Sequence, residues 1–407
     1  MRAFAAVAVL CLAVLAAGCW DSREPNDMVY AMAVGFDIDD DGQYVAAIQF
    51  ANPAANQASG GSSRSSSSGQ YPFWTYSAKG HTPAEAVAAL RPYVPREITL
   101  THAEVLLVSE RLARHGIGPI LDFIARSWQA RLLIAGGVVD GDLMELLRAQ
   151  SPADPIPALS IRRLLDRVKE SEIAPSAPDL LTAVSSVLRV GGDLILPVLK
   201  VHGRQSGESG GLSAALEPPA QAPFAHSGAA AFRSDKMVGF IDSKEARGAG
   251  FVLNKAGSAT IHVDSPVGGL LSIRVVGAAA KLVPSFEDGR VSFLVKVSAS
   301  GYIEGETAFG ASTADVSDKE FANHVRARLA QAIREDIEAA FDKSLECGSD
   351  FLQLGNAVHR MLPRVWKSEV GDRWYDILQE VTLDIQVETE LAQPGLLRQK
   401  PLKSGGA

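Results

Sequence analysis

The residues that could catalyse a reaction or bind a metal are present in this sequence, but not at the spacings that such sites require. Eight histidines are scattered along the chain, and no two lie three or four residues apart, as zinc ligands on a helix would. Residues 207–211 match the G-x-S-x-G pattern of a nucleophilic serine, but glycines and prolines surround them instead of the required strand and helix. Residues 248–250 lack the third glycine of a dinucleotide-binding loop, because Leu253 stands there. We therefore expect no catalytic residues, no cofactor and no metal site.

An acidic turn at residues 37–42 is similar to the first half of a calcium-binding loop. Aspartates stand at every second position and a glycine follows them, as in such a loop. The glutamate that completes a calcium loop would fall at position 48, which is Ile48. We therefore interpret this segment as a solvated hairpin turn between strands at residues 28–37 and 43–52.

Cys19 has the sequence context of a lipid attachment site. Residues 3–17 form an unbroken apolar run after Arg2. This run is shorter than the roughly 20 residues of a membrane-spanning helix and is typical of a signal peptide. It leads into Leu-Ala-Ala-Gly-Cys, which resembles a bacterial lipobox, with small residues before the cut and a thiol that can be alkylated. We predict a signal peptide at residues 1–18 and an acylated Cys19, carrying palmitate-like chains, that anchors the protein on the extracytoplasmic face of a membrane.

The composition is that of a folded protein with several domains. The chain has 407 residues, of which 47% are hydrophobic and 21% charged, and its formal net charge is −8. At about 100–200 residues per domain, this length predicts two to four domains. The acidic balance argues against a nucleic-acid partner. Three cysteines are too few for a disulfide-based scaffold.

Strand-like and helix-like segments alternate without a regular strand–helix–strand rhythm. This favours an α+β fold of three mixed α/β domains, strand-rich, with antiparallel or mixed sheets flanked by helices. In chain order, we expect an N-terminal α+β domain at 19–200 with a flexible serine-rich loop at 59–69, a linker at 201–223, a middle β-rich domain at 224–285, a C-terminal α+β domain at 286–393 and a tail at 394–407.

One long helix is predicted at residues 317–346. Ser317 and Glu320 form a capping box, and apolar residues then recur every fourth position from Phe321 to Leu345. A spacing of four advances the stripe by roughly 40° per step around an α-helix. We therefore expect this helix to contact different neighbours along its length.

Four blocks of residues extend from Cys19 to within about a dozen residues of the C-terminus. They lie at 19–37, at 101–123, at 231–248 and from 350 to a strand before Gly395, and they include the segments Val-Gly-Phe-Asp, Thr-His-Ala-Glu and Pro-Arg-Val-Trp. In this order they resemble the Ger(x)C family, the GerAC-like C-subunit lipoproteins of spore nutrient germinant receptors. Pro25 and the length of the serine-rich loop depart from that pattern. The positions that match the family's motifs are His102, Glu110, Arg114, Asp235, Gly239, Glu245, Asp350, Pro363, Trp366 and Trp374.

The resemblance implies a non-catalytic receptor subunit that is required for nutrient-triggered germination. It also implies two integral membrane partners, an A-type and a B-type subunit, and a location on the spore inner membrane. From the residues alone, we interpret the two tryptophans as core anchors and His102 as a buried, hydrogen-bonded histidine. Asp350 and Arg114 are equally compatible with helix caps, salt bridges or interface contacts.

A second class of protein fits the predicted anchor. An extracytoplasmic solute-binding lipoprotein of a transporter would have the same signal peptide and acylated cysteine. It would also have two α/β lobes with repeated strand–helix units and a cleft between them. The strand-rich middle of this chain shows no such repeat, which favours the receptor subunit.

Overall fold

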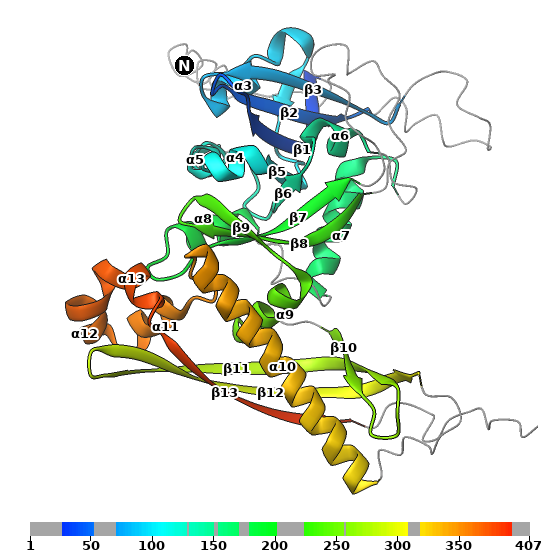
Figure 1. Ribbon diagram of the computed structural model, residues 1–407. Helices are drawn as coiled ribbons and strands as arrows, with labels where there is room; N and C mark the ends of the chain where they lie inside the picture. The colour runs from blue at the N-terminus through cyan, green and yellow to red at the C-terminus, as the bar shows by residue number, and fades with distance from the viewer. Residues whose placement is uncertain are drawn as a thin grey trace, which may run out of the picture.

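The computed structural model describes residues 27–52, 71–127, 130–149, 154–170, 179–201, 224–255, 258–307 and 318–392. Within these ranges the chain forms two sheets flanked by helices (Figure 1), which confirms the predicted α+β class. The predicted signal peptide, Cys19, the serine-rich loop, the predicted tail at 394–407 and all of the predicted linker except Val201, which ends β7, lie outside the described residues.

The first sheet is mixed and has the strand order β3-β2-β1-β5-β6-β7-β8-β9, with β4 beside β1. Strands β1, β4, β5, β6 and β7 run parallel, and the remaining pairs are antiparallel. The parallel strand β5 is buried along its whole length, as expected for a strand covered on both faces. The bounds are β1 (Met28–Ile38), β2 (Tyr44–Ala51), β3 (Phe73–Gly80), β4 (Glu97–Thr99), β5 (Val105–Ser109), β6 (Ala135–Asp140), β7 (Ile195–Val201), β8 (Phe224–Arg233) and β9 (Lys236–Ile241).

Helices cover both faces of this sheet. One face packs against α3 (Pro83–Ala88), α4 (Glu110–His115), α5 (Gly118–Arg126) and α8 (Leu180–Val187). The other face packs against α6 (Leu143–Arg148) and α7 (Pro157–Glu170). Figure 1 shows these two groups on opposite sides of the strands. The predicted hairpin turn between β1 and β2 is confirmed, because Asp39 Oδ1 accepts hydrogen bonds from the backbone N–H groups of Asp41 and Gln43.

The second sheet has the order β10-β11-β12-β13. A long antiparallel hairpin forms its centre, and the last strand pairs parallel to β12. Two helices pack on its buried face, and short helices fill the segment before the last strand. The bounds are α9 (Ser243–Val252), β10 (Ala259–Asp264), β11 (Leu270–Glu287), β12 (Arg290–Glu306), α10 (Lys319–Cys347), α11 (Leu354–Met361), α12 (Pro363–Val365), a π-turn (Trp366–Val370), α13 (Trp374–Leu378) and β13 (Thr382–Leu391).

The long helix α10 confirms the predicted apolar stripe but not its predicted cap. Phe321, Val325 and Leu329 are buried, and the helix contacts α9, β10 and β13, as a winding stripe requires. The helix begins one residue later than the predicted capping box, with Asp318 as the N-cap that accepts a hydrogen bond from Glu320 N–H. Ser317 lies outside the described residues.

The boundaries expected for a middle domain at 224–285 do not follow the sheets. Strands β8 and β9 extend the first sheet, because Ile195 of β7 pairs with Ala231 of β8. The boundary expected between residues 285 and 286 falls inside β11, within the β11–β12 hairpin. One apolar core contains residues of β7, β8 and β9 together with residues of the second sheet and α10. The two sheets therefore share a core. No helix of the described chain is long and apolar enough to span a membrane.

Candidate functional site: a buried carboxylate junction between the two sheets

Asp193, just before β7, connects four segments of the chain. Its backbone N–H donates to the Asp350 carbonyl (3.0 Å), and its Oδ2 accepts from the Asp350 N–H (2.7 Å). Its Oδ1 accepts from the Ser234 N–H in the β8–β9 turn and from the Tyr375 hydroxyl of α13, both at 2.9 Å. This side chain is buried and thus joins the first sheet to the end of the chain.

Asp350 lies fully buried on the other side of the same junction. Its carboxyl accepts the backbone N–H groups of Leu354 and Gly355 at the start of α11, each at 2.8 Å. It also accepts the indole N–H of Trp374 at 2.9 Å. Asp350 therefore caps a helix and orients a tryptophan, and its backbone holds Asp193.

Burial dominates the protonation of this pair. Burial raises the pKa of Asp350 to about 8, and the negative charge of nearby Asp193 raises it further. The three N–H donors act in the opposite direction, because they stabilise the ionised carboxylate. Burial also raises the pKa of Asp193, against the donors from Ser234 and Asp350, the Tyr375 hydroxyl and the charge of Arg233. The pKa of Tyr375 is raised by burial and by Asp193. The Arg233 guanidinium lies 4.2 Å from the centre of the Tyr375 ring and places a positive charge near the Asp193 carboxyl.

Backbone segments approach closely around this pair. A Cβ added at Gly355 would lie 2.6 Å from the Trp374 indole nitrogen, and one added at Gly191 would lie 2.5 Å from the Gly355 carbonyl carbon. Gly191 also has φ +67°, which side chains rarely adopt. Trp366 and Trp374 are buried beside one another, with ring centres 5.8 Å apart, as their interpretation as core anchors expected. A side chain at Gly191 or Gly355 would therefore clash with the neighbouring segment.

Asp235 forms a second contact between distant parts of the sequence. It lies in the turn between β8 and β9, where its carbonyl accepts from the Ile117 N–H (2.9 Å) and its Oδ2 accepts from the Gly118 N–H (3.2 Å). A Cβ added at Gly116 or Gly118 would meet this carboxyl within 2.9 Å. Asp235 therefore links the β8–β9 turn to the start of α5.

Other predicted positions stabilise single elements. Glu110 and Arg114 form an ion pair one turn apart on α4, and the Arg114 guanidinium also lies over the Phe240 ring. Glu245 completes a capping box with Asp242 at the start of α9. Pro363, Gly239 and His102 are not among the described residues that form hydrogen bonds with Asp193 or Asp350.

These last three positions each have a local role. Pro363 is the first residue of α12, where its missing N–H costs nothing. A Cβ added at Gly239 would lie 2.6 Å from Cys347 Sγ. His102 is exposed, so its interpretation as a buried histidine is wrong; the loop before β5 places it on the surface, where Nδ1 lies 3.0 Å from Thr101 Oγ1.

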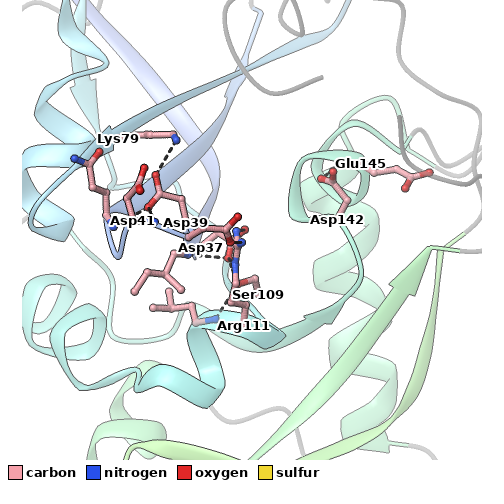
Figure 2. Close-up of polar contacts among 12 residues, drawn as sticks. Asp37, Asp39, Asp41, Lys79, Ser109, Arg111, Asp142 and Glu145 are labelled. Atoms are coloured by element: carbon pink, nitrogen blue, oxygen red, sulfur yellow. Dashed lines mark hydrogen bonds and ion pairs between the residues drawn. The ribbon is translucent and has the colours of Figure 1, made fainter. Parts of the chain in front are cut away.

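A charged cluster lies at the edge where the parallel strands end (Figure 2). Arg111 contacts Asp37 (3.0 Å) and Asp40 (2.9 Å), and the Ser109 hydroxyl also donates to Asp37. Lys79 pairs with Asp39 at 2.7 Å, which lowers the pKa of Asp39. Arg111 and Lys79 thus form ion pairs with these aspartates. Among the described residues, no group of three or more histidines, cysteines or carboxylates is arranged to hold a metal ion.

The sequence did not single out Asp193, Arg233 or Tyr375. A signal exists for Asp193, since a lone acid after Gly191-Gly192 directly precedes the apolar run of β7. Nothing in the local sequence indicates that two of its partners, Asp350 and Tyr375, lie more than 150 residues away.

The two halves of this junction belong to two regions that match models of known families. Residues 21–201 match the "Spore germination protein N-terminal domain", and residues 227–395 match "Spore germination B3/ GerAC like, C-terminal". The chain belongs to the GerAC-like family of spore germination proteins. Asp193 lies in the first matched region, and Ser234, Asp350 and Tyr375 lie in the second. The junction thus joins the two family regions.

Individual relatives agree with this assignment over nearly the whole chain. Spore germination protein KC of Bacillus subtilis (strain 168) is 25% identical over 98% of this chain and 97% of its own length. Spore germination protein B3 of the same organism is 20% identical over 93% of this chain and 94% of its own. The crystal structure of the GerBC protein superposes with a TM-score of 0.53 at 17% identity, covering 89% of this chain and 97% of that one, which shows a shared fold.

Proposed function

We propose that this protein is a lipid-anchored subunit of a spore nutrient germinant receptor. Acylated Cys19 holds it on the extracytoplasmic face of the spore inner membrane. There it acts without catalysis, together with an A-type and a B-type integral membrane subunit. The observation that carries the proposal is the match of both family regions to this chain, directly after a lipobox-like segment.

The buried junction supports a role as a rigid adaptor. The two sheets share a core, and the carboxyl of Asp193 binds the first family region to the second. A contact made on one region would therefore be transmitted to the other as a movement of the whole body. A hinged solute-binding protein would instead need two lobes that move apart around a ligand.

Anchoring makes association effective. Partners embedded in the same membrane are confined to a thin layer, so a tether raises their effective concentration and a modest interface suffices. The motif positions stabilise caps, turns and close backbone contacts. They therefore maintain the shape of a binding body and form no reaction centre.

Metabolic labelling and affinity purification test this proposal. Cys19→Ala should abolish incorporation of a labelled fatty acid and lower the amount of protein at the membrane. Cys347→Ala, which removes the other cysteine outside the predicted signal peptide, should leave labelling unchanged. The wild-type protein, solubilised from spore membranes, should co-purify with two integral membrane proteins.

Two outcomes would contradict the proposal. Equal labelling of the Cys19→Ala variant would show that the anchor is elsewhere. Micromolar or tighter calorimetric binding of a free amino acid or sugar, without co-purified membrane proteins, would favour the solute-binding lipoprotein.

A further inference from the structure

One edge of the first sheet combines exposed leucines with exposed arginines. The parallel strands β1, β4, β5 and β6 all begin at this edge, which we name the amino edge. Its exposed side chains come from the segments before β4 and β6 and from α8: Arg91, Arg96, Arg131, Leu132, Leu133, Leu181 and Leu188.

Backbone hydrogen bonds place these leucines beside the start of β1. Glu104 N–H donates to the Met32 carbonyl of β1, and Ala135 N–H donates to the Glu104 carbonyl. Leu132 and Leu133 directly precede this row, two strand spacings or about 10 Å from β1. The Leu181 N–H in turn donates to the Leu132 carbonyl, which brings α8 to the same edge.

The apolar part of the amino edge is larger than an isolated exposed side chain. Leu132, Leu133, Leu181 and Leu188 are 49%, 65%, 51% and 76% exposed. The last two are seven residues apart, on α8 and at its C-cap, so they lie about two turns apart on one face. The helix itself, from Leu180 to Val187, carries no charged side chain. Leucines exposed together in this way indicate a surface that something covers.

The charge of the amino edge is basic, although the protein as a whole is acidic. Arg91 and Arg96 precede β4, whose first residue, Glu97, pairs with Met28, and Arg131 precedes the two leucines. Asp27, which directly precedes β1, and Glu97 are the exposed acidic residues beside these three arginines. The opposite edge carries Asp37, Asp39 and Asp40 around Arg111 and Lys79 (Figure 2). The domain is thus polarised, with its positive and apolar edge at the start of β1.

The chain length before β1 ties this edge to the membrane. Seven residues lie between Cys19 and Asp27, the first described residue, and the eight steps from Cys19 to Asp27 can span about 29 Å at most. An acyl anchor at Cys19 therefore holds the start of β1 close to the bilayer. Arginines attract anionic headgroups, and leucines enter the boundary between headgroups and acyl chains.

We infer that the amino edge rests on the bilayer surface, with Leu133 and Leu188 seated among anionic phospholipids. This orientation rests on the proposed anchor at Cys19 and adds to it a second membrane contact. It turns the acidic edge away from the membrane. The single lipid site thereby becomes an oriented attachment.

Site-directed fluorescence quenching tests this orientation without depending on acylation. The chain from residue 20, which keeps every described residue, is tethered through an N-terminal hexahistidine tag to nickel-chelating lipid in vesicles of phosphatidylcholine and phosphatidylglycerol. In a Cys347→Ser background, an environment-sensitive fluorophore is attached at Leu133→Cys, at Leu188→Cys or at the control Leu270→Cys. Leu270 is similarly exposed, at 46%, but lies on β11 of the second sheet.

Doxyl-labelled lipid should quench the first two positions by about twofold or more over the control, because an apolar face enters the interface by about 5–10 Å. Replacing phosphatidylglycerol by phosphatidylcholine should reduce that difference. Equal quenching at all three positions would overturn the inference. The inference would also be overturned if both labelled positions were quenched no more than the control while a separate Leu133→Asp/Leu188→Asp variant lost its co-purified membrane proteins, because the edge would then be a protein interface. Fatty-acid labelling of Cys19 reports separately on the proposed function.

Discussion

The hydrogen bond from Trp374 to Asp350 offers a quantitative test of the junction. Trp374→Phe removes the indole N–H that donates to Asp350 Oδ2 and keeps an aromatic ring in place. Trp366→Phe is the matched control. Trp366 is also buried in the same core, 5.8 Å from the first ring, and its indole N–H makes no hydrogen bond to a described residue. The two variants lose the same ring atoms, so the difference between them isolates the hydrogen bond.

The size of that difference depends on the charge of Asp350. A buried hydrogen bond between neutral groups contributes about 0.5–1.5 kcal/mol, and one to a charged group about 1.5–3 kcal/mol. Burial raises the pKa of Asp350 to about 8, so the carboxyl is protonated at pH 6 and ionised at pH 9. We expect Trp374→Phe to be less stable than Trp366→Phe by about 1 kcal/mol at pH 6 and about 2 kcal/mol at pH 9.

Urea unfolding followed by circular dichroism at both pH values measures these free energies. Comparable m-values for the two variants are the control, because they show that the same surface is exposed on unfolding. Equal losses of stability in the two variants at pH 9 would refute the reasoning, since the bond to Asp350 would then contribute nothing.

Further predictions concern the same fold. The folded state keeps the Asp350 proton up to about pH 8, whereas the unfolded chain releases it near 3.8, so stability should fall by about 1 kcal/mol between pH 7 and 8.5. The stability of the Asp350→Asn variant, measured over the same pH range, should lack this fall. An unchanged dependence of stability on pH would contradict the prediction. Gly248→Ala should destabilise the folded protein by about 1–3 kcal/mol, because the added Cβ would lie 2.5 Å from the Asp336 carbonyl carbon. The control Gly305→Ala, where a Cβ meets open space, should change thermal stability by less than about 0.5 kcal/mol. Leu329 is fully buried on α10, so Leu329→Ala should lower the free energy of unfolding by about 2–5 kcal/mol. The N-cap variant Asp318→Ala should lower it by about 1 kcal/mol. Urea titration measures both, and the reverse order would show that the apolar stripe is misassigned.

Local patterns predicted the elements well. The apolar residues at every fourth position of α10 specify a helix, and its winding stripe specifies several neighbours, because both follow from the geometry of a single helix. The hairpin between β1 and β2 was equally predictable from the sequence, because Asp39 closes it through hydrogen bonds to residues two and four positions later.

Pairings between distant segments were not predictable in the same way. The apolar residues of β8 fit either sheet, and its place beside β7 depends on where the chain returns after residues 202–223. Asp193 likewise has an ordinary sequence context, and its function depends on the Asp350 N–H and the Tyr375 hydroxyl, which only the folded chain brings near. The motif-like positions were therefore located by resemblance, and their roles became evident from their contacts.

The most direct test of the receptor role is the nutrient response of spores that lack this protein. The fall in optical density of the spore suspension is measured after addition of nutrients and, in parallel, after a nutrient-independent trigger. The account predicts that deletion abolishes the response to one class of nutrient and leaves the nutrient-independent response intact. A normal response to every nutrient, in a strain with no paralogue to compensate, would contradict it.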